Sequence, residues 1–230
     1  MPVLAIDCAQ RFCSAALYDE AAGKLIASRS PDIGRGHAEL LAGIVSELFA
    51  DADLTFSDIT RIGVTIGPGS FAGIRVGVSF ARGLAIPLGI PVLGVSSLLA
   101  IACPVASARS RAVMAAIDAK RDRVWATMVA ADGSMLAAPA EHTAQGAATI
   151  ARAEGALVVG SASPLLLAAD PDLDPELILD EETTRSAPDI ESVAAMTAIA
   201  DPADHPAEPA YLRSPDAKPQ AGFAVARTAE

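Results

Sequence analysis

A glycine-rich segment, Gly67 to Gly77, is a candidate anion-binding site. It reads Gly-Pro-Gly-Ser-Phe-Ala-Gly-Ile-Arg-Val-Gly and follows a predicted strand at residues 61–66. A helix is predicted over residues 71–85, so the segment could present the N–H groups of a helix N-terminus to a ligand. The segment lacks the Lys-Ser/Thr ending of a P-loop, which excludes that class of nucleotide site.

Small residues recur at every fourth position of this segment and the helix that follows it: Gly69, Gly73, Gly77, Ala81 and Ala85. Each glycine costs about 1 kcal/mol of helix propensity, which suggests a packing purpose. A preceding helix, predicted over residues 37–50, carries a broad apolar stripe. The small residues could pack on the chain's own sheet or against a partner. The predicted partner interface consists of Leu40, Leu41, Ile44, Leu48, Gly73, Gly77 and Ala81.

The polar side chains with catalytic potential have no second catalytic residue close to them in the sequence. His37 could be a ligand or a base, but a single histidine just before a helix is more often a capping residue. Ser70 and Ser97 have no base close to them in the sequence. We therefore predict no catalytic residue, no metal ligand and no cofactor-binding residue in this chain.

The composition predicts a cytoplasmic globular protein without a membrane span. Of 230 residues, 28 are acidic and 17 basic, and the net charge of −11 makes unaided nucleic-acid binding unfavourable. Three cysteines without paired spacing argue against a disulfide framework and a zinc site. Residues 83–108 carry no charge, but Pro and Gly divide them into a helix end, a buried strand and a new helix start.

Two segments of the chain match element by element, which predicts an internal duplication. Ala5-Ile6-Asp7 and Ala116-Ile117-Asp118 each end an apolar strand, and a polar turn and two further strands follow. Helices and strands then alternate in both halves, so each half reads βββαβα. The second half takes its helices from residues 144–153 and 190–199, with a weaker strand at 177–179. Two βββαβα halves in one chain are typical of the actin-like, Hsp70-like (ASKHA) superfamily. We therefore predict an N-terminal lobe at 1–104 and a C-terminal lobe at 105–210. Residues 211–230 are expected to form a partly disordered tail.

The turns that hold phosphate in nucleotide-binding members of that superfamily contain glycine, and here they do not. The first turn covers residues 7–12 and the second residues 118–123. A Cβ at each position crowds the approach of phosphate oxygens. Lys120, Arg121 and Arg123 could still meet an anion, although three charges in one turn are typical of a solvated loop.

Several motifs in a fixed order resemble the TsaB (YeaZ) family. They are Ala5-Ile6-Asp7, residues 37–41 (His-Ala-Glu-Leu-Leu), the segment with Gly67, Pro68, Gly69, Ser70, Phe71, Gly73 and Arg75, residues 82–85, and residues 94–98. The resemblance is strong over the first hundred residues. Later anchors are residues 117–121 and 209–213, and residues 138–204 match by position alone.

The resemblance implies a non-catalytic role in making threonylcarbamoyladenosine next to the anticodon of tRNAs that read ANN codons. In that family's picture the paralogue TsaD transfers the group, TsaE is an ATPase partner, and TsaB binds and supports TsaD. The metal-binding histidines of TsaD correspond to Ser97 and Ile101 here, which cannot ligate a metal together. Cys8 and Ala72 also depart from the family's usual residues.

The resemblance further implies a heterodimer with TsaD, tRNA contact only through the complex, and a homodimer as an option for the isolated chain. ATP or ADP is expected only at a composite interface with partners. The alternative function is an active enzyme of the same fold, either a small-molecule kinase or a metallopeptidase of the glycoprotease (M22-like) kind.

Overall fold

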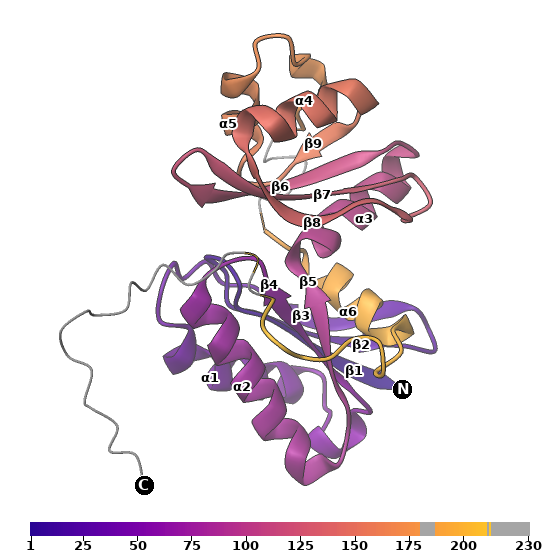
Figure 1. Cartoon of the computed structure of the whole chain (residues 1–230). Helices are drawn as coiled ribbons and strands as arrows, with labels where there is room; N and C mark the ends of the chain where they lie inside the picture. Colours follow the sequence, from indigo (N-terminus) through magenta and orange to yellow (C-terminus); the bar gives the residue numbers. More distant parts are fainter. Residues whose placement is uncertain (180–186, 211, 213–230) are drawn as a thin grey trace, which may run out of the picture.

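The computed structural model describes residues 1–179, 187–210 and 212, which form two lobes with one β-sheet each (Figure 1). The strands of the first sheet are β1 (Pro2–Asp7), β2 (Ser14–Asp19), β3 (Lys24–Arg29), β4 (Ile62–Gly67) and β5 (Val92–Ser96). Their order is β3-β2-β1-β4-β5, with β1, β4 and β5 parallel and β2 antiparallel to both β1 and β3.

The second sheet repeats this arrangement with one strand fewer. Its strands are β6 (Val113–Lys120), β7 (Arg123–Val129), β8 (Met135–Thr143) and β9 (Leu157–Val159), in the order β8-β7-β6-β9. The β6–β7 and β7–β8 pairs are antiparallel, and β6 pairs with β9 in parallel. In the second sheet β6 therefore holds the place that β1 holds in the first.

Helices α1 (His37–Asp51) and α2 (Phe71–Leu88) lie side by side on one face of the first sheet (Figure 1). Successive side chains of a strand point to opposite faces, so β1 serves two cores. Leu4 and Ile6 pack in the core under α1 and α2. Val3 and Ala5 pack on the opposite face, against helix α6 (Ile190–Ile199).

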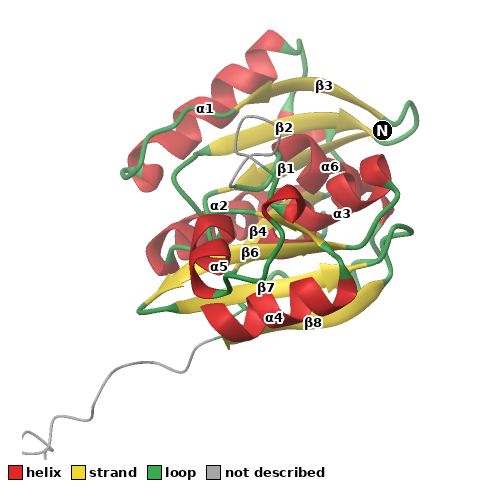
Figure 2. Cartoon of the chain, turned by 90° about the horizontal axis from the view of Figure 1, so that it is seen from above, coloured by secondary structure: helices red, strands yellow, loops and turns green. Residues whose placement is uncertain are grey.

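The same alternation organises the second lobe. Met114 and Ala116 of β6 face the core under α4 (Ala144–Glu154) and α5 (Ser163–Ala169). Val113 and Ala115 face α3 (Ser97–Arg109), whose buried side chains also reach the core of the first lobe through Ala100. Helix α3 thus lies between the two sheets, and Figure 2 shows α4 on the other side of the second sheet.

The described topology confirms the predicted fold class. The order β1-β2-β3-α1-β4-α2 is matched by β6-β7-β8-α4-β9-α5, which is a duplicated βββαβα fold of the actin-like kind. The sequence did not predict α5, and residues 177–179 form only one bridge, between Ile178 and Val158. The two short 3-10 helices lie at Phe56–Asp58 and Pro175–Leu177.

Helix α6 was predicted as the last helix of the second half, and the structure corrects this. It packs on the first sheet, where Gly63 leaves the room that the Thr197 side chain occupies. Arg61 donates to the carbonyl of Ala200 at 3.0 Å and so provides a hydrogen-bond partner for a carbonyl at the C-terminal end of the helix. The apolar pattern of α6 predicted burial correctly but could not specify the sheet.

The last described residues return along the edge of the first sheet. Gly94 N–H donates to the carbonyl of His205 at 2.9 Å, and Ala210 N–H donates to Ile66 at 2.9 Å. The predicted disordered tail at 211–230 lies outside the described residues, except for Leu212, which packs near the core around α3.

Helix α2 is, in the described part of the chain, the one helix long and apolar enough to cross a membrane by length and composition. Its inner side, with Ile74, Val78 and Ala81, is buried in the core of the first lobe. Packing on β1 and β4 therefore explains the apolar residues on this inner side. The uncharged residues 83–108 form the end of α2, β5 and most of α3, in the order that the sequence predicted.

Candidate functional site

The glycine-rich segment packs against the turn between β1 and β2. A Cβ on Gly69 would clash with the carbonyl of Ala9, and one on Gly73 would clash with the carbonyl of Cys8. The Ser70 N–H donates to the Ala9 carbonyl at 2.6 Å, and the Ser70 hydroxyl accepts from Gly73 N–H at 3.2 Å as the N-cap of α2. The motif glycines thus allow the helix N-terminus to approach the turn closely, and a carbonyl of the turn already accepts a hydrogen bond from the Ser70 N–H at the start of α2.

Asp7 lies at the end of β1, beneath this contact, and is fully buried. Its Oδ1 accepts from Thr65 at 2.5 Å and from Ala9 N–H at 2.9 Å, whereas its Oδ2 has no hydrogen-bond partner among the described residues. Burial raises the pKa of Asp7, and the hydrogen bonds from Thr65 and Ala9 oppose that rise. The equivalent Asp118 is part-exposed and bonded to Lys120. Burial raises the pKa of Asp118, but the hydrogen bonds and the charge of Lys120 together outweigh burial, so the pKa is lowered.

Two thiols meet behind the same turn. The Sγ atoms of Cys8 and Cys13 lie 4.0 Å apart, and both side chains are buried. The contact with Cys13, together with burial, raises the pKa of Cys8 above its usual range. Burial also raises the pKa of Cys103. Cys8 and Cys103 are therefore thiols at neutral pH, which is the unreactive form.

His37 is neither a cap nor an accessible base. It is the first residue of α1, the N-cap position is Gly36, and the His37 ring is buried. Its Nε2 lies 3.1 Å from the carbonyl oxygen of Phe12, so this nitrogen donates a hydrogen bond to the β1–β2 turn. The capping role suggested by the sequence is thus replaced by a contact between α1 and a turn 25 residues earlier.

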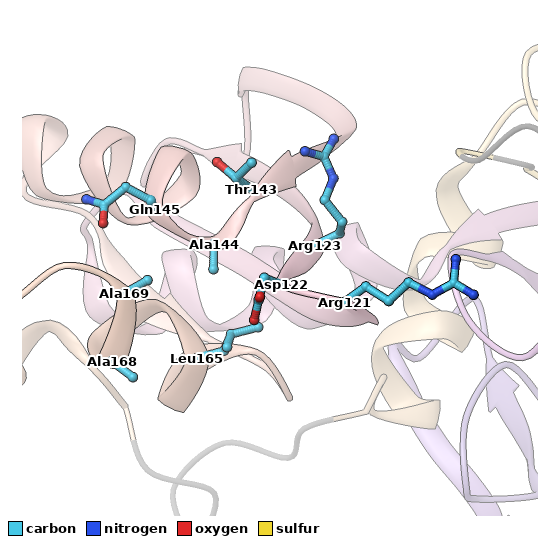
Figure 3. A pocket seen from close by; sticks show the side chains of 9 residues that line it. All are labelled: Arg121, Asp122, Arg123, Thr143, Ala144, Gln145, Leu165, Ala168 and Ala169. Atoms are coloured by element: carbon cyan, nitrogen blue, oxygen red, sulfur yellow. The ribbon is translucent and has the colours of Figure 1, made fainter.

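The corresponding turn of the second lobe, between β6 and β7, borders a hollow of about 400 Å³ (Figure 3). Lys120, Arg121 and Asp122 all adopt positive φ angles there, without a glycine. In Figure 3 the Arg121 and Arg123 side chains extend away from the hollow, and Arg123 pairs with Glu141 at 2.8 Å.

The helix that begins beside this hollow, α4, already uses two of its first N–H groups. Ala144 N–H donates to the Asp122 carbonyl at 3.0 Å, and Gly146 N–H donates to the Thr143 hydroxyl at 3.0 Å. The Asp122 carboxylate adds negative charge beside them. The geometry therefore favours the solvated-loop interpretation of Lys120, Arg121 and Arg123 over a phosphate site.

The positions that correspond to metal ligands lie inside the protein. Ser97 and Ile101 are one turn apart on α3, and both are buried. Within the described ranges, no three His, Cys, Asp or Glu side chains gather to hold a metal ion.

The predicted partner interface divides into buried and exposed residues. Leu41, Leu48, Gly73, Gly77 and Ala81 face the core of their own lobe, and a Cβ on Gly77 would lie 3.3 Å from Val64. The small-residue ridge therefore packs on the chain's own sheet, the first of the two interpretations left open above. Leu40, with 45% of its surface exposed, and the half-buried Ile44 remain accessible.

A different row of small residues covers the outside of α1 and α2. All of its members are exposed: Ala42, Gly43 and Ser46 on α1, and Ala72, Ser79 and Gly83 on α2. We call this set the outer helix face. A Cβ on Gly43 or Gly83 would meet no atom within 4 Å, so the chain's own packing does not require glycine at either position. The sequence signal for this face is the pair of helical glycines, because Gly43 and Gly83 carry the same helix-propensity cost as Gly73.

An aromatic–arginine pair stands at the N-terminal end of this face. Phe71 is 55% exposed, and the Arg75 guanidinium carbon lies 3.8 Å from the centre of its ring. Both belong to the glycine-rich motif, but unlike Gly69 and Gly73 they point outward. Exposed aromatic and arginine side chains are typical of protein–protein contacts.

Comparison with known proteins gives one family match. The model of a family described as TsaD, tRNA N6-adenosine threonylcarbamoyltransferase, matches residues 30–157. An uncharacterised protein of Mycobacterium tuberculosis H37Rv is 34% identical over 222 residues, covering 95% of both chains. The tRNA threonylcarbamoyladenosine biosynthesis protein TsaB of Escherichia coli K12 is 34% identical over 126 residues, which cover 54% of this chain and 53% of that relative.

Solved structures agree over almost the whole chain. YeaZ from Pseudomonas aeruginosa superposes with a TM-score of 0.75 at 26% identity, covering 92% of this chain and 99% of that one. A second crystal structure, of a protein from Pseudomonas aeruginosa with similarity to peptidase YeaZ, gives a TM-score of 0.76 at 29% identity with the same coverage. The likeness therefore includes the second lobe, where the sequence motifs fade.

Proposed function

The chain belongs to the TsaB (YeaZ) family, and from this premise we propose that it supports TsaD as a non-catalytic subunit in tRNA threonylcarbamoyladenosine biosynthesis. The observation that carries the proposal is the outer helix face. Helical glycine is about 1 kcal/mol less favourable than alanine, and Gly43 and Gly83 gain nothing from it within their own lobe. A helix of another subunit lying across this face would explain both residues, because small side chains allow close helix approach.

The occupant that we propose is the α1–α2 helix pair of TsaD, the paralogous chain. The family model that matches residues 30–157 spans α1 and α2, so TsaD carries corresponding helices. Leu40, Ile44 and Phe71 would supply apolar contact at the edge of this interface, and Arg75 would add a charge that orients the pair. A homodimer through the same face is the competing assembly of the isolated chain.

The remaining parts of the proposal follow from the family. TsaE would join as a further partner, any ATP or ADP would lie at a composite interface, and tRNA would reach the chain only within the complex. The proposed location of this complex is the cytoplasm. The alternative, a kinase or metallopeptidase, is less well supported, because the Cys8 and Ala9 carbonyls press against the glycine-rich segment and Ser97 and Ile101 are buried.

Gly83→Leu tests the proposal directly. Gly83 lies on the exposed side of α2, and a Cβ there would meet no described atom within 4 Å, so the variant should unfold at or above the wild-type temperature. Its affinity for TsaD from the same organism should nevertheless fall by at least about tenfold, which equals about 1.4 kcal/mol of binding free energy. Calorimetric titration of TsaD into each variant measures this loss.

Ala153→Leu is the matched control, because Ala153 is an exposed residue of α4 in the second lobe. It should bind TsaD as the wild type does. A folded Gly83→Leu protein with wild-type affinity for TsaD would place the interface elsewhere on the chain.

A further inference from the structure

A cavity of about 520 Å³ opens beside the carboxyl ends of β4 and β5, away from the outer helix face. Ile66 and Ser96 come from these strands, Leu99 comes from α3, and Met196 and Ile199 come from α6. The volume lies in the range of small-molecule sites, about 300–1,000 Å³, and the carboxyl ends of parallel strands are where open α/β sheets bind ligands.

The outer wall of the cavity is fixed by backbone hydrogen bonds. The segment 205–210 bonds to Gly94 and Ile66, and Pro206 bridges Leu93. A Cβ on Gly94 would lie 2.6 Å from the Pro206 carbonyl oxygen, so glycine at this position lets the segment lie against β5. The cavity is therefore lined by strands β4 and β5, helices α3 and α6, and this segment.

The cavity lining combines an apolar wall with negative charge. Leu99, Met196 and Ile199 are apolar, and Ile199 leaves 87% of its surface exposed. Asp201, Asp204 and Glu208 also line the cavity, and none of them forms an ion pair in the part of the chain that the structure describes. No described lysine or arginine lines the cavity.

The apolar wall and the unpaired carboxylates together select a ligand with an alkyl chain and a positive charge. The Ser96 hydroxyl oxygen is inaccessible to solvent, so it does not face the cavity and takes no part in this selection.

We propose that the cavity binds a small aliphatic amine, with its alkyl chain along Leu99, Met196 and Ile199 and its ammonium group among Asp201, Asp204 and Glu208. The probe is hexylammonium, with 1-hexanol and hexanoate as neutral and anionic molecules of the same chain length. Amide shifts of Gly94 and Ile199 in ¹H–¹⁵N spectra of the full chain report binding. Hexylammonium should saturate these shifts and bind about fivefold more tightly than hexanol, since a solvent-exposed ion pair has that order of strength. Hexanoate should not bind.

Asp204→Asn combined with Glu208→Gln should remove the preference for hexylammonium over hexanol and leave hexanol binding unchanged. Asp53→Asn combined with Glu154→Gln changes the net charge equally at two exposed sites, in the turn after α1 and on α4, and should keep the preference. The spectra themselves show whether each variant is folded. Equal binding of the three probes, or an unchanged preference in the Asp204 and Glu208 variant, would overturn the proposal.

Two further probes separate a free amine from a lysine of a partner protein. 1,6-Diaminohexane carries a second ammonium group that can pair with another of the three carboxylates, and it should bind more tightly than hexylammonium. Tighter binding of Nα-acetyl-lysine N-methylamide than of the diamine would instead assign the cavity to a polypeptide and contradict a small-molecule ligand.

Discussion

Thr65 of β4 donates a hydrogen bond of 2.5 Å to the buried carboxyl group of Asp7 at the end of the neighbouring strand β1. The bond joins the two central parallel strands of the first sheet directly below the glycine-rich segment. Because only Oδ1 of Asp7 is bonded, the carboxylate form of Asp7 is poorly compensated in this position.

Asp7→Asn should change the pH dependence of stability. Burial raises the folded-state pKa of Asp7. The stabilisation that Asp7 gives the folded state is therefore fully present below the pKa of an unfolded aspartate, about 3.9. It is lost as pH rises through the folded-state pKa. Asparagine keeps the acceptor for Thr65 and does not titrate. The free energy of unfolding of the variant, relative to wild type, should therefore increase with pH. Urea unfolding between pH 4.5 and 8 measures this difference, and parallel pH profiles for the two proteins would contradict it.

Two glycines of the same helix should respond oppositely to alanine. Gly73→Ala places a Cβ against the Cys8 carbonyl and should cost about 1–3 kcal/mol through overpacking. Gly83→Ala meets no neighbour and should gain up to about 1 kcal/mol from helix propensity. Urea unfolding of both variants at one pH tests the pair, and equal effects would show that backbone propensity alone decides both sites.

The isolated chain should neither bind ATP tightly nor hydrolyse it. The N-terminus of α2 is in contact with the Cys8 and Ala9 carbonyls, and the first N–H groups of α4 bond to Asp122 and Thr143. Calorimetric titration of ATP with magnesium into the purified chain should show no saturable heat. A dissociation constant of about 1 μM, or about −8 kcal/mol, without any partner would refute this prediction.

The isolated chain should also fail to retain tRNA at physiological salt. Its net charge of −11 offers no gain from counterion release. Filter binding at about 0.15 M salt, where exposed charges are screened beyond about 8 Å, measures tRNA retention by the chain alone and by the chain with TsaD. Tight retention by the chain alone would mean that a local basic surface outweighs the net charge.

The sequence predicted those features of the fold that depend on local pattern. The strands that end in Asp7 and Asp118, the turns after them and the amphipathic helices lie where the pattern placed them, because alternation along a strand and periodicity along a helix are local signals. Helix α6 was assigned to the wrong sheet because an apolar helix carries no mark of which sheet it will cover.

The candidate site was harder to predict, because glycine has no side chain to show which way it faces. Gly73 and Gly83 are alike in the sequence, yet a Cβ on Gly73 would meet a backbone carbonyl, whereas a Cβ on Gly83 would meet no described atom within 4 Å. The hydrogen bond from His37 to Phe12 joins residues 25 positions apart, and no local pattern indicates it. The sequence therefore predicted that residues 37–50 and 71–85 form helices, but only the structure shows which side of α2 is exposed.

The return of α6 to the first sheet sets an order for folding during synthesis. Residues 1–104 reach the outside of the ribosome first, but the face of β1 that carries Val3 and Ala5 is covered by residues 190–198. Chains fold vectorially, at about 5–20 residues added per second. The earlier-made lobe must therefore wait, with an apolar sheet face uncovered, until the second lobe has been made, and it is completed last. A nascent chain halted after α5 would present that uncovered face to chaperones, although its second sheet is already whole.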